Sequence, residues 1–220
     1  MKESEVILDF FYKLNNEKIQ YVLLHNIGDE LPYNFKFGKD IDILVRDIDR
    51  NRFKKLLKQN YWKRIKHSHD YIDEKNIDHF IFLYNMFPFE MYKNKISKMI
   101  IDVCYQLNCK SINNGEWMPL DQKINDSVWS TRKFNNKFHW YELNVEDQLI
   151  HLIIRSIFYK KNFSNEYIEE INGLLKNVNI IKLEHKLDLI FFRFSSNLLN
   201  MIKEKNFHEI IDNYHRFSNY

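Results

Sequence analysis

The chain has 220 residues, of which 45% are hydrophobic and 29% are charged, a balance typical of a globular protein with a substantial core. Its 33 basic and 30 acidic residues leave a net charge of +3, too small for the positive field of a general nucleic-acid binder. Two cysteines, Cys104 and Cys109, are too few for a disulfide framework, and the chain shows neither an apolar signal segment nor a run of about 18 apolar residues. We therefore expect a cytoplasmic protein with free thiols and no transmembrane segment.

A helix over residues 4–16 and a strand over residues 20–25 are the first predicted elements. Val6, Phe10 and Leu14 follow the helical period, and Ser4 stands where an N-cap is expected. The strand ends where its apolar run gives way to His25 and Asn26. The helix is predicted to cover one face of the sheet that contains this strand.

A strand over residues 39–45 carries two aspartates. Side chains alternate between the faces of a strand, so Asp40 and Asp42 point one way while Ile41 and Ile43 point into a core. Two carboxylates on one face repel each other unless a cation lies between them, and hard divalent ions such as Mg²⁺ prefer carboxylate oxygens. The pattern predicts a metal site. The alternative is an edge strand with a solvated acidic face.

The next segment combines a basic helix with strand-like runs. Asp47 or Asp49 is predicted to cap a helix that ends near residue 59. The basic residues of this helix are expected to form a solvated face rather than to touch an anionic substrate. Strands are predicted at 61–67 and 77–84, and a loop or short helix at 89–97. The pair His67 and His69 suggests zinc, but no cysteine or third histidine stands at a usual spacing, so a zinc site is not expected.

A third aspartate lies within the apolar run of residues 98–104. Asp102 is flanked by Ile101 and Val103, and a buried carboxylate in such a strand is costly unless it is paired or binds a metal. Asp102 therefore also predicts a cation nearby.

This order of strand, loop, D-x-D strand and later Asp-bearing strand resembles the nucleotidyltransferase superfamily, the polymerase-β-like fold. The resemblance covers roughly residues 5–107 and implies an α+β protein with a mixed sheet flanked by helices. In that family the D-x-D carboxylates bind two Mg²⁺ ions and a third carboxylate completes the site. The resemblance thus assigns Asp40, Asp42 and Asp102 as catalytic residues and as ligands of Mg²⁺ or Mn²⁺, with a nucleoside triphosphate (NTP) as substrate.

The loop over residues 26–39 departs from the family pattern. Where the family has a Gly-Gly or Gly-Ser turn that holds the nucleotide phosphates, this chain has His25-Asn26, with Gly28 two residues further on. The resemblance implies that His25, Asn26, Gly38 and Lys39 border the phosphates. The alternative is an ordinary connection between two strands.

The pattern becomes helical after a short predicted helix at 121–128 and a predicted strand at 139–143. Helices are predicted at 145–160, 164–177, 183–203 and 206–217, and a boundary near residue 144 divides an α/β core, residues 1–144, from a C-terminal helical bundle, residues 145–220. Asp147, His151, Arg155 and Tyr159 recur every fourth residue and form a polar stripe on the first of these helices. The stripe predicts either surface ion pairs or a cleft wall where Arg155 and Lys160 bind triphosphate oxygens, with His151 as a further contact.

Three functions remain open at this level. The first is a metal-dependent nucleotidyltransferase that moves a nucleoside monophosphate from an NTP to a small acceptor. A looser likeness to nucleotidyltransferase-like proteins of bacterial polysaccharide gene clusters implies a sugar or glycan precursor as that acceptor. The second is an inactive relative that binds a nucleotide, or a protein partner through its C-terminal helices. The third is a toxin–antitoxin enzyme that nucleotidylates a protein or tRNA.

Overall fold

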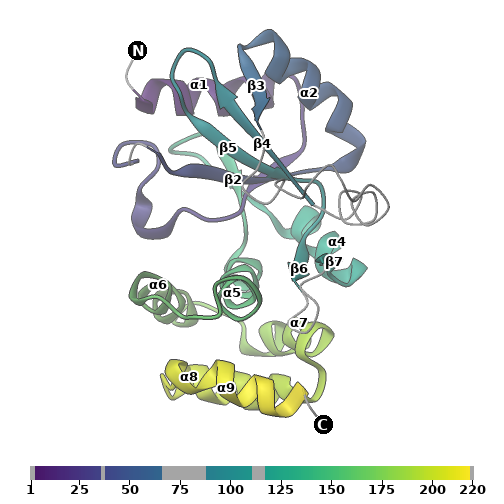
Figure 1. Cartoon of the computed structure of the whole chain (residues 1–220), viewed down its shortest axis with the longest axis vertical. Helices are drawn as coiled ribbons and strands as arrows, with labels where there is room; N and C mark the ends of the chain where they lie inside the picture. Colours follow the sequence, from purple (N-terminus) through teal and green to yellow (C-terminus); the bar gives the residue numbers. More distant parts are fainter. Residues whose placement is uncertain (1–2, 36–37, 66–87, 111–116, 219–220) are drawn as a thin grey trace, which may run out of the picture.

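A central sheet separates two layers of helices in the computed structural model, which describes residues 3–35, 38–65, 88–110 and 117–218 (Figure 1). The helices are α1 (Glu3–Asn16), α2 (Arg50–Gln59), α4 (Gln122–Thr131), α5 (Val145–Ile154), α6 (Asn165–Leu175), α7 (Ile180–Phe191), α8 (Ser195–Lys203) and α9 (Phe207–Ser218). Helices α1 and α2 cover one face of the sheet, and α5 to α9 lie beyond the other (Figure 1). Among the described residues, no helix has the length and apolar character needed to cross a membrane.

The sheet has seven strands within the described residues, in the order β3-β4-β5-β2-β1-β9-β8. They are β1 (Tyr21–Leu23), β2 (Asp40–Val45), β3 (Trp62–Ile65), β4 (Phe89–Asn94), β5 (Ile100–Cys104), β8 (Lys133–Asn135) and β9 (Trp140–Glu142), while β6 (Asn108–Lys110) and β7 (Trp117–Pro119) form a separate hairpin. Strands β2 and β5 are parallel neighbours, and β1 pairs with β2 antiparallel. The two predicted aspartate-bearing strands therefore lie side by side at the centre of the sheet.

Strand alternation divides the apolar residues between two cores. Ile41, Ile43 and Val103 pack with α1 and α2 in one core. Leu44 and Cys104 pack with α4 to α9 in the other. Asp40, Asp42 and Asp102 belong to the second face by the same alternation, so they point toward the helices that follow the sheet. The predicted division at residue 144 stays a prediction, since the second core joins strands to C-terminal helices.

Residues 89–97, predicted as a loop or short helix, contain strand β4, so that prediction is wrong. The segment is a strand because it is hydrogen-bonded on both sides, antiparallel to β3 and to β5. Its buried face carries Glu90, Tyr92 and Asn94 rather than aliphatic residues, which conceals the apolar alternation of a strand.

The helix predicted over residues 183–203 is also interrupted. Helices α7 and α8 are joined by a 3-10 turn, Phe192–Phe194, whose first residue has a φ of +50°. Left-handed backbone does not continue an α-helix, so the chain changes direction there. The strand predicted at 77–84 and the pair His67 and His69 lie outside the described residues.

The basic helix α2 faces an internal acidic partner. Arg50 and Lys54 both donate to Glu90 Oε1 on β4, at 3.0 and 2.7 Å. These two basic residues thus hold a carboxylate of the sheet, on the face opposite the aspartates. Asp49 takes the N-cap position of α2 but its side chain does not cap the helix; it accepts instead from the Gln20 backbone N–H and from Arg52.

Candidate active site

Three carboxylates meet on the sheet face that looks toward the C-terminal helices. Asp42 on β2 is in register with Asp102 on β5, and Asp40 lies two residues before Asp42 on the same face. Each side chain offers one carboxylate oxygen, and the three oxygens all lie within 4.8 Å of one another. Asp42 and Asp102 are 6% and 9% exposed, whereas Asp40 is open to solvent. The sequence placed Asp40 and Asp42 together, and parallel pairing adds Asp102.

Burial makes this group expensive as a set of bare anions. Desolvation and, to a smaller extent, the Asp40 carboxylate raise the pKa of Asp42 to about 6 against the opposing effect of Arg155. A nearby cation lowers the cost of keeping such a buried carboxylate ionised. The three oxygens form a ligand set suited to a hard divalent ion such as Mg²⁺ or Mn²⁺, so the residues present fit the metal that the sequence predicts.

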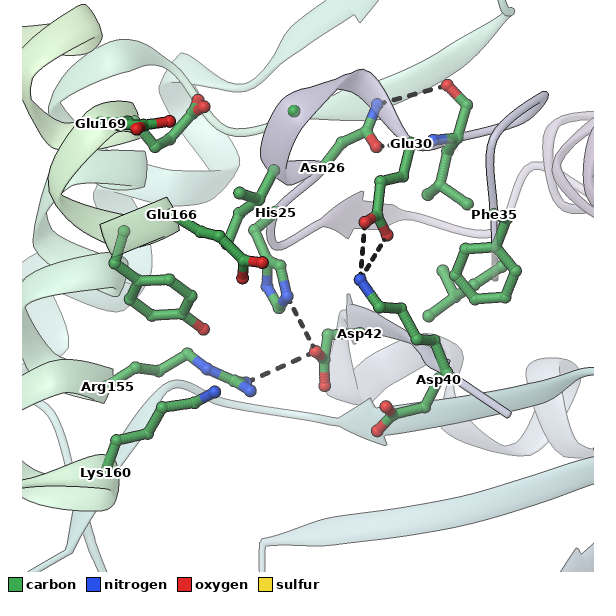
Figure 2. Close-up of a pocket in the computed structure, with 17 residues that line it drawn as sticks. His25, Asn26, Glu30, Phe35, Asp40, Asp42, Arg155, Lys160, Glu166 and Glu169 are labelled. Atoms are coloured by element: carbon green, nitrogen blue, oxygen red, sulfur yellow. Dashed lines mark hydrogen bonds and ion pairs between the residues drawn. The ribbon is translucent and has the colours of Figure 1, made fainter. Parts of the chain in front are cut away.

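Arg155 and Lys160 reach the aspartates from the turn that follows α5. This segment, Arg155–Lys160, is π-helical. In an α-helix, residues five apart point about 140° away from each other, whereas the wider i→i+5 turn brings them toward the same side. Both side chains consequently extend side by side toward Asp42 (Figure 2). Arg155 Nη1 lies 3.4 Å from Asp42 Oδ2.

The polar stripe predicted on α5 does not form i,i+4 surface pairs. Asp147 is buried and bonds to Lys186 of α7 and to Thr131 of α4. Arg155 pairs instead with Asp42 on β2. Burial lowers the pKa of Arg155, but Asp42 and Tyr167 raise it by more, so the guanidinium stays charged. His151 is directed inward, where its ring stacks on His25 with centroids 5.6 Å apart.

His25 contacts the acidic group directly. Its Nε2 lies 3.2 Å from Asp42 Oδ2. Burial, followed by the nearby Arg155 charge, lowers the pKa of His25 to about 3, so the ring is neutral at pH 7 and its Nε2–H can donate to Asp42. Burial likewise lowers the pKa of His151. His25 thus holds the Asp42 carboxylate, a contact that the sequence did not predict, and its predicted phosphate contact stays a prediction.

A cleft of about 600 Å³ opens above Asp40 and Asp42, a size typical of small-molecule sites. Five of the residues predicted to contact the nucleotide line it: His25, Asn26, Lys39, Arg155 and Lys160. Gly38 does not: it borders a separate small cavity beside Met99, so its predicted contact with a nucleotide is not supported by its position.

The loop at the mouth of the cleft is tied down by its own side chains. The Asn26 amide accepts from the Leu31 N–H at 2.8 Å and donates to the Leu31 carbonyl at 3.4 Å. Lys39 Nζ donates to both carboxylate oxygens of Glu30, at 2.6 and 2.7 Å (Figure 2). Gly28 has a φ of +64°, which permits the tight turn that follows β1.

Helix α6 contributes a cleft wall that the sequence analysis did not anticipate. Glu166, Tyr167, Glu169 and Glu170 line the cleft, and Tyr167 is itself buried. Glu166 extends from α6 toward the space beside His25 and Asp42 (Figure 2). The acidic residues recur at helical spacing beside the buried Tyr167 and Ile171, a pattern that marks a polar face but does not show what it faces.

Comparison with known proteins gives a match in structure and none in sequence. No protein-family model matches the chain, and no curated protein matches it. A crystal structure of ANT(2'')-Ia, an aminoglycoside nucleotidyltransferase, in complex with adenylyl-2''-tobramycin superimposes with a TM-score of 0.51 at 8% identity, covering 88% of this chain and 98% of that one. The chain has a nucleotidyltransferase fold. A solution structure of ANT(2'')-Ia gives a TM-score of 0.49 at 10% identity, with 93% and 100% of the two chains covered.

The nucleotidyltransferase fold confirms the predicted class, an α+β protein with a mixed sheet flanked by helices and followed by further helices. At 8% identity the likeness concerns the fold alone.

Proposed function

We propose that this protein is a metal-dependent nucleotidyltransferase that moves a nucleoside monophosphate from an NTP to a small acceptor. The observation that carries the proposal is the meeting of Asp40, Asp42 and Asp102 beneath a cleft in a nucleotidyltransferase fold. Three clustered carboxylates, two of them buried, are costly to a fold and are accounted for if they hold cations. A cytoplasmic location, where NTPs are made, belongs to the same proposal.

The charged and polar residues around the aspartates each have a part in this proposal. Asp40, Asp42 and Asp102 would hold Mg²⁺ or Mn²⁺, which when bound would neutralise the triphosphate and lower the pKa of the attacking acceptor oxygen. His25 holds the Asp42 carboxylate in place. Arg155 and Lys160, and Lys39 when it leaves Glu30, provide donors for the phosphate oxygens, and positioning of this kind is the main contribution of a protein to phosphoryl and nucleotidyl transfer.

A small-molecule acceptor fits the size and the charge of the cleft. The walls near the aspartates are basic, whereas the α6 wall carries Glu166, Glu169 and Glu170. A second anionic ligand would be repelled from that side, and a hydroxyl- or amine-bearing molecule would not. ANT(2'')-Ia is described in complex with an adenylylated small molecule. We keep a sugar or glycan precursor of bacterial polysaccharide clusters as the proposed acceptor.

The proposal is tested by calorimetric titration of the protein with each of the four NTPs, with and without Mg²⁺. We expect binding that depends on Mg²⁺, followed by pyrophosphate release when a panel of sugars and aminoglycosides is added. Binding without pyrophosphate release from any acceptor would favour the alternative of an inactive nucleotide-binding protein. Label from radioactive NTP on a co-expressed protein or tRNA would favour the toxin–antitoxin alternative. Absence of binding to every NTP would overturn the proposal.

Replacement of Lys160 by methionine is expected to weaken Mg·NTP binding by roughly tenfold or more, the loss expected for one hydrogen bond to a charged group. The adjacent Lys161 provides a matched control, because it is exposed and is not among the residues that line the cleft. Lys161→Met should leave the dissociation constant within about twofold of the parent, since an exposed charge outside the cleft is screened by water and salt. Equal effects of the two substitutions would mean that Lys160 acts only through net charge.

A further inference from the structure

Among the basic groups of the described chain that act on Asp42, which are Arg155 and Lys160, Arg155 has the larger effect and forms an ion pair with it. Asp42 Oδ2 has two neighbours, neutral His25 at 3.2 Å and the Arg155 guanidinium at 3.4 Å. The distance to Arg155 is long for a charge-assisted hydrogen bond, which is normally about 2.7–2.9 Å. The contact is therefore an ion pair with one long and weak hydrogen bond, and such a pair is readily exchanged for a better partner.

The Arg155 guanidinium also has hydrogen-bonding capacity that is not used. Its Nε is buried and has no hydrogen-bond partner among the described residues. A buried donor without a partner is uncommon and indicates a missing acceptor. Because Arg155 lines the cleft beside Lys160, the missing acceptor can be an oxygen of a ligand in that cleft. Phosphate oxygens suit the fork of a guanidinium, which binds them in pairs.

A divalent ion on Asp42 and the guanidinium at its present distance would repel each other. Both would lie within a few ångströms of one carboxylate that is itself only 6% exposed, and like charges repel each other more strongly beside such a buried group than in bulk water. Binding of a metal ion alone therefore destabilises the Arg155–Asp42 pair. A triphosphate that binds together with the metal relieves this repulsion, because it offers Arg155 a new anionic partner.

We propose that Arg155 is an exchangeable counter-ion, which neutralises Asp42 in the free protein and moves to the triphosphate when metal and nucleotide bind. The site then takes a metal–triphosphate complex as a unit and discriminates against a divalent ion alone. This inference rests on the proposed function and adds to it the order and the coupling of ligand binding. The coupling is a property of the binding equilibrium, so it can be measured without turnover.

The test uses Mn²⁺ alone and Mn²⁺ with inorganic tripolyphosphate, which needs no knowledge of the base. Free Mn²⁺ is measured by electron paramagnetic resonance, and the complex is titrated calorimetrically, for the parent and for Arg155→Met. We expect the variant to bind Mn²⁺ alone more tightly than the parent and Mn·tripolyphosphate more weakly, so that the coupling between the two ligands falls by about tenfold or more. A variant that is merely damaged would lose both affinities.

Two further variants separate this role from a general effect of charge. Arg155→Lys keeps the positive charge and should stay close to the parent in the Mn²⁺ measurement. Lys160→Met removes a phosphate donor whose charge acts on Asp42 more weakly than that of Arg155, so it should weaken tripolyphosphate binding and raise the Mn²⁺ affinity less than Arg155→Met does. Melting temperatures establish that each variant is folded.

Opposite signs for Mn²⁺ and Mn·tripolyphosphate in Arg155→Met would support the exchange. An Mn²⁺ affinity equal to or below that of the parent would overturn it, as would unchanged tripolyphosphate binding. A parent protein that binds neither probe would have no metal site, and the proposed function would fail before the role of Arg155 arose.

Discussion

Replacement of Asp42 by asparagine is expected to abolish magnesium-dependent nucleotide binding while the protein stays folded. Asparagine keeps the shape of the side chain and loses the charge, so a divalent ion loses one of its carboxylate ligands. Turnover should fall by at least 10²–10³-fold, the usual cost of removing a group that stabilises charge in a transition state. Calorimetric titration with Mg·NTP and a pyrophosphate assay measure the two effects.

The stability of the Asp42→Asn protein should change little, because two effects oppose each other. Removal of one carboxylate relieves its repulsion with Asp40 and its burial as an anion, both of which raise the pKa of Asp42. The same change leaves Arg155 without its charged partner. We therefore expect a melting temperature close to that of the parent, which distinguishes a lost site from a lost fold.

Two companion variants make the result specific. Asp102→Asn should have the same effect on nucleotide binding, although Asp102 lies on a different strand and the Arg155–Asp42 contact is retained. Asp47 lies just beyond β2, and its side chain is 74% exposed. Asp47→Asn should therefore leave nucleotide binding unchanged. An Asp42→Asn protein that binds Mg·NTP as well as the parent would contradict the metal assignment.

The parts of the site that could be predicted from the sequence are those set by local geometry. The spacing of Asp40 and Asp42 places both on one face of a strand whatever the rest of the chain does. The apolar residues around Asp102 indicate a central strand, and the family resemblance supplies the pairing that brings it to β2. Arg155 and Lys160 were predicted as phosphate contacts from their chemistry. Their common direction depends on a π-helical turn, which the residue spacing of an α-helix does not predict.

The parts that could not be predicted depend on contacts between distant segments. The Arg155–Asp42 contact joins residues 113 positions apart, and the His25–His151 stack joins the segment after β1 to α5. Glu166 and Glu169 look like any exposed helix face until α6 is placed against the cleft. Strand β4 was missed because its buried face is polar, and a polar face is buried only where other segments supply partners for it.

Glu90, at the centre of that polar face, is expected to be the carboxylate with the largest effect on stability. It is 6% exposed and accepts four hydrogen bonds. The donors and their distances are Arg50 at 3.0 Å, Lys54 at 2.7 Å, Tyr92 at 2.7 Å and Tyr105 at 2.9 Å. Burial alone would raise the pKa of Glu90, but these bonds outweigh it and lower the pKa to about 2.

Glu90→Gln should lower the free energy of unfolding by about 2 kcal/mol. Breaking a buried ion pair usually costs about 3–5 kcal/mol, and the expected loss is smaller here because Arg50 and Lys54 can turn to water. For a chain of this size the melting temperature would fall by roughly 4–8 °C. Chemical denaturation measures the change, with Glu204→Gln on the exposed surface as the control. Magnesium-dependent nucleotide binding should be retained in the folded variant, because Glu90 lies on the face of the sheet opposite Asp102.

The same carboxylate should dominate the acid sensitivity of the parent. The pKa of Glu90 is lowered from 4.5 to about 2 on folding, so the unfolded chain binds the proton more readily than the folded protein. The contribution of Glu90 is therefore complete above pH 4.5 and is lost as the pH falls toward 2, on the order of 2 kcal/mol after allowance for solvent around Arg50 and Lys54. Denaturation curves between pH 7 and pH 2 should converge for the parent and Glu90→Gln. A constant difference across that range would mean that the loss comes from packing rather than from charge.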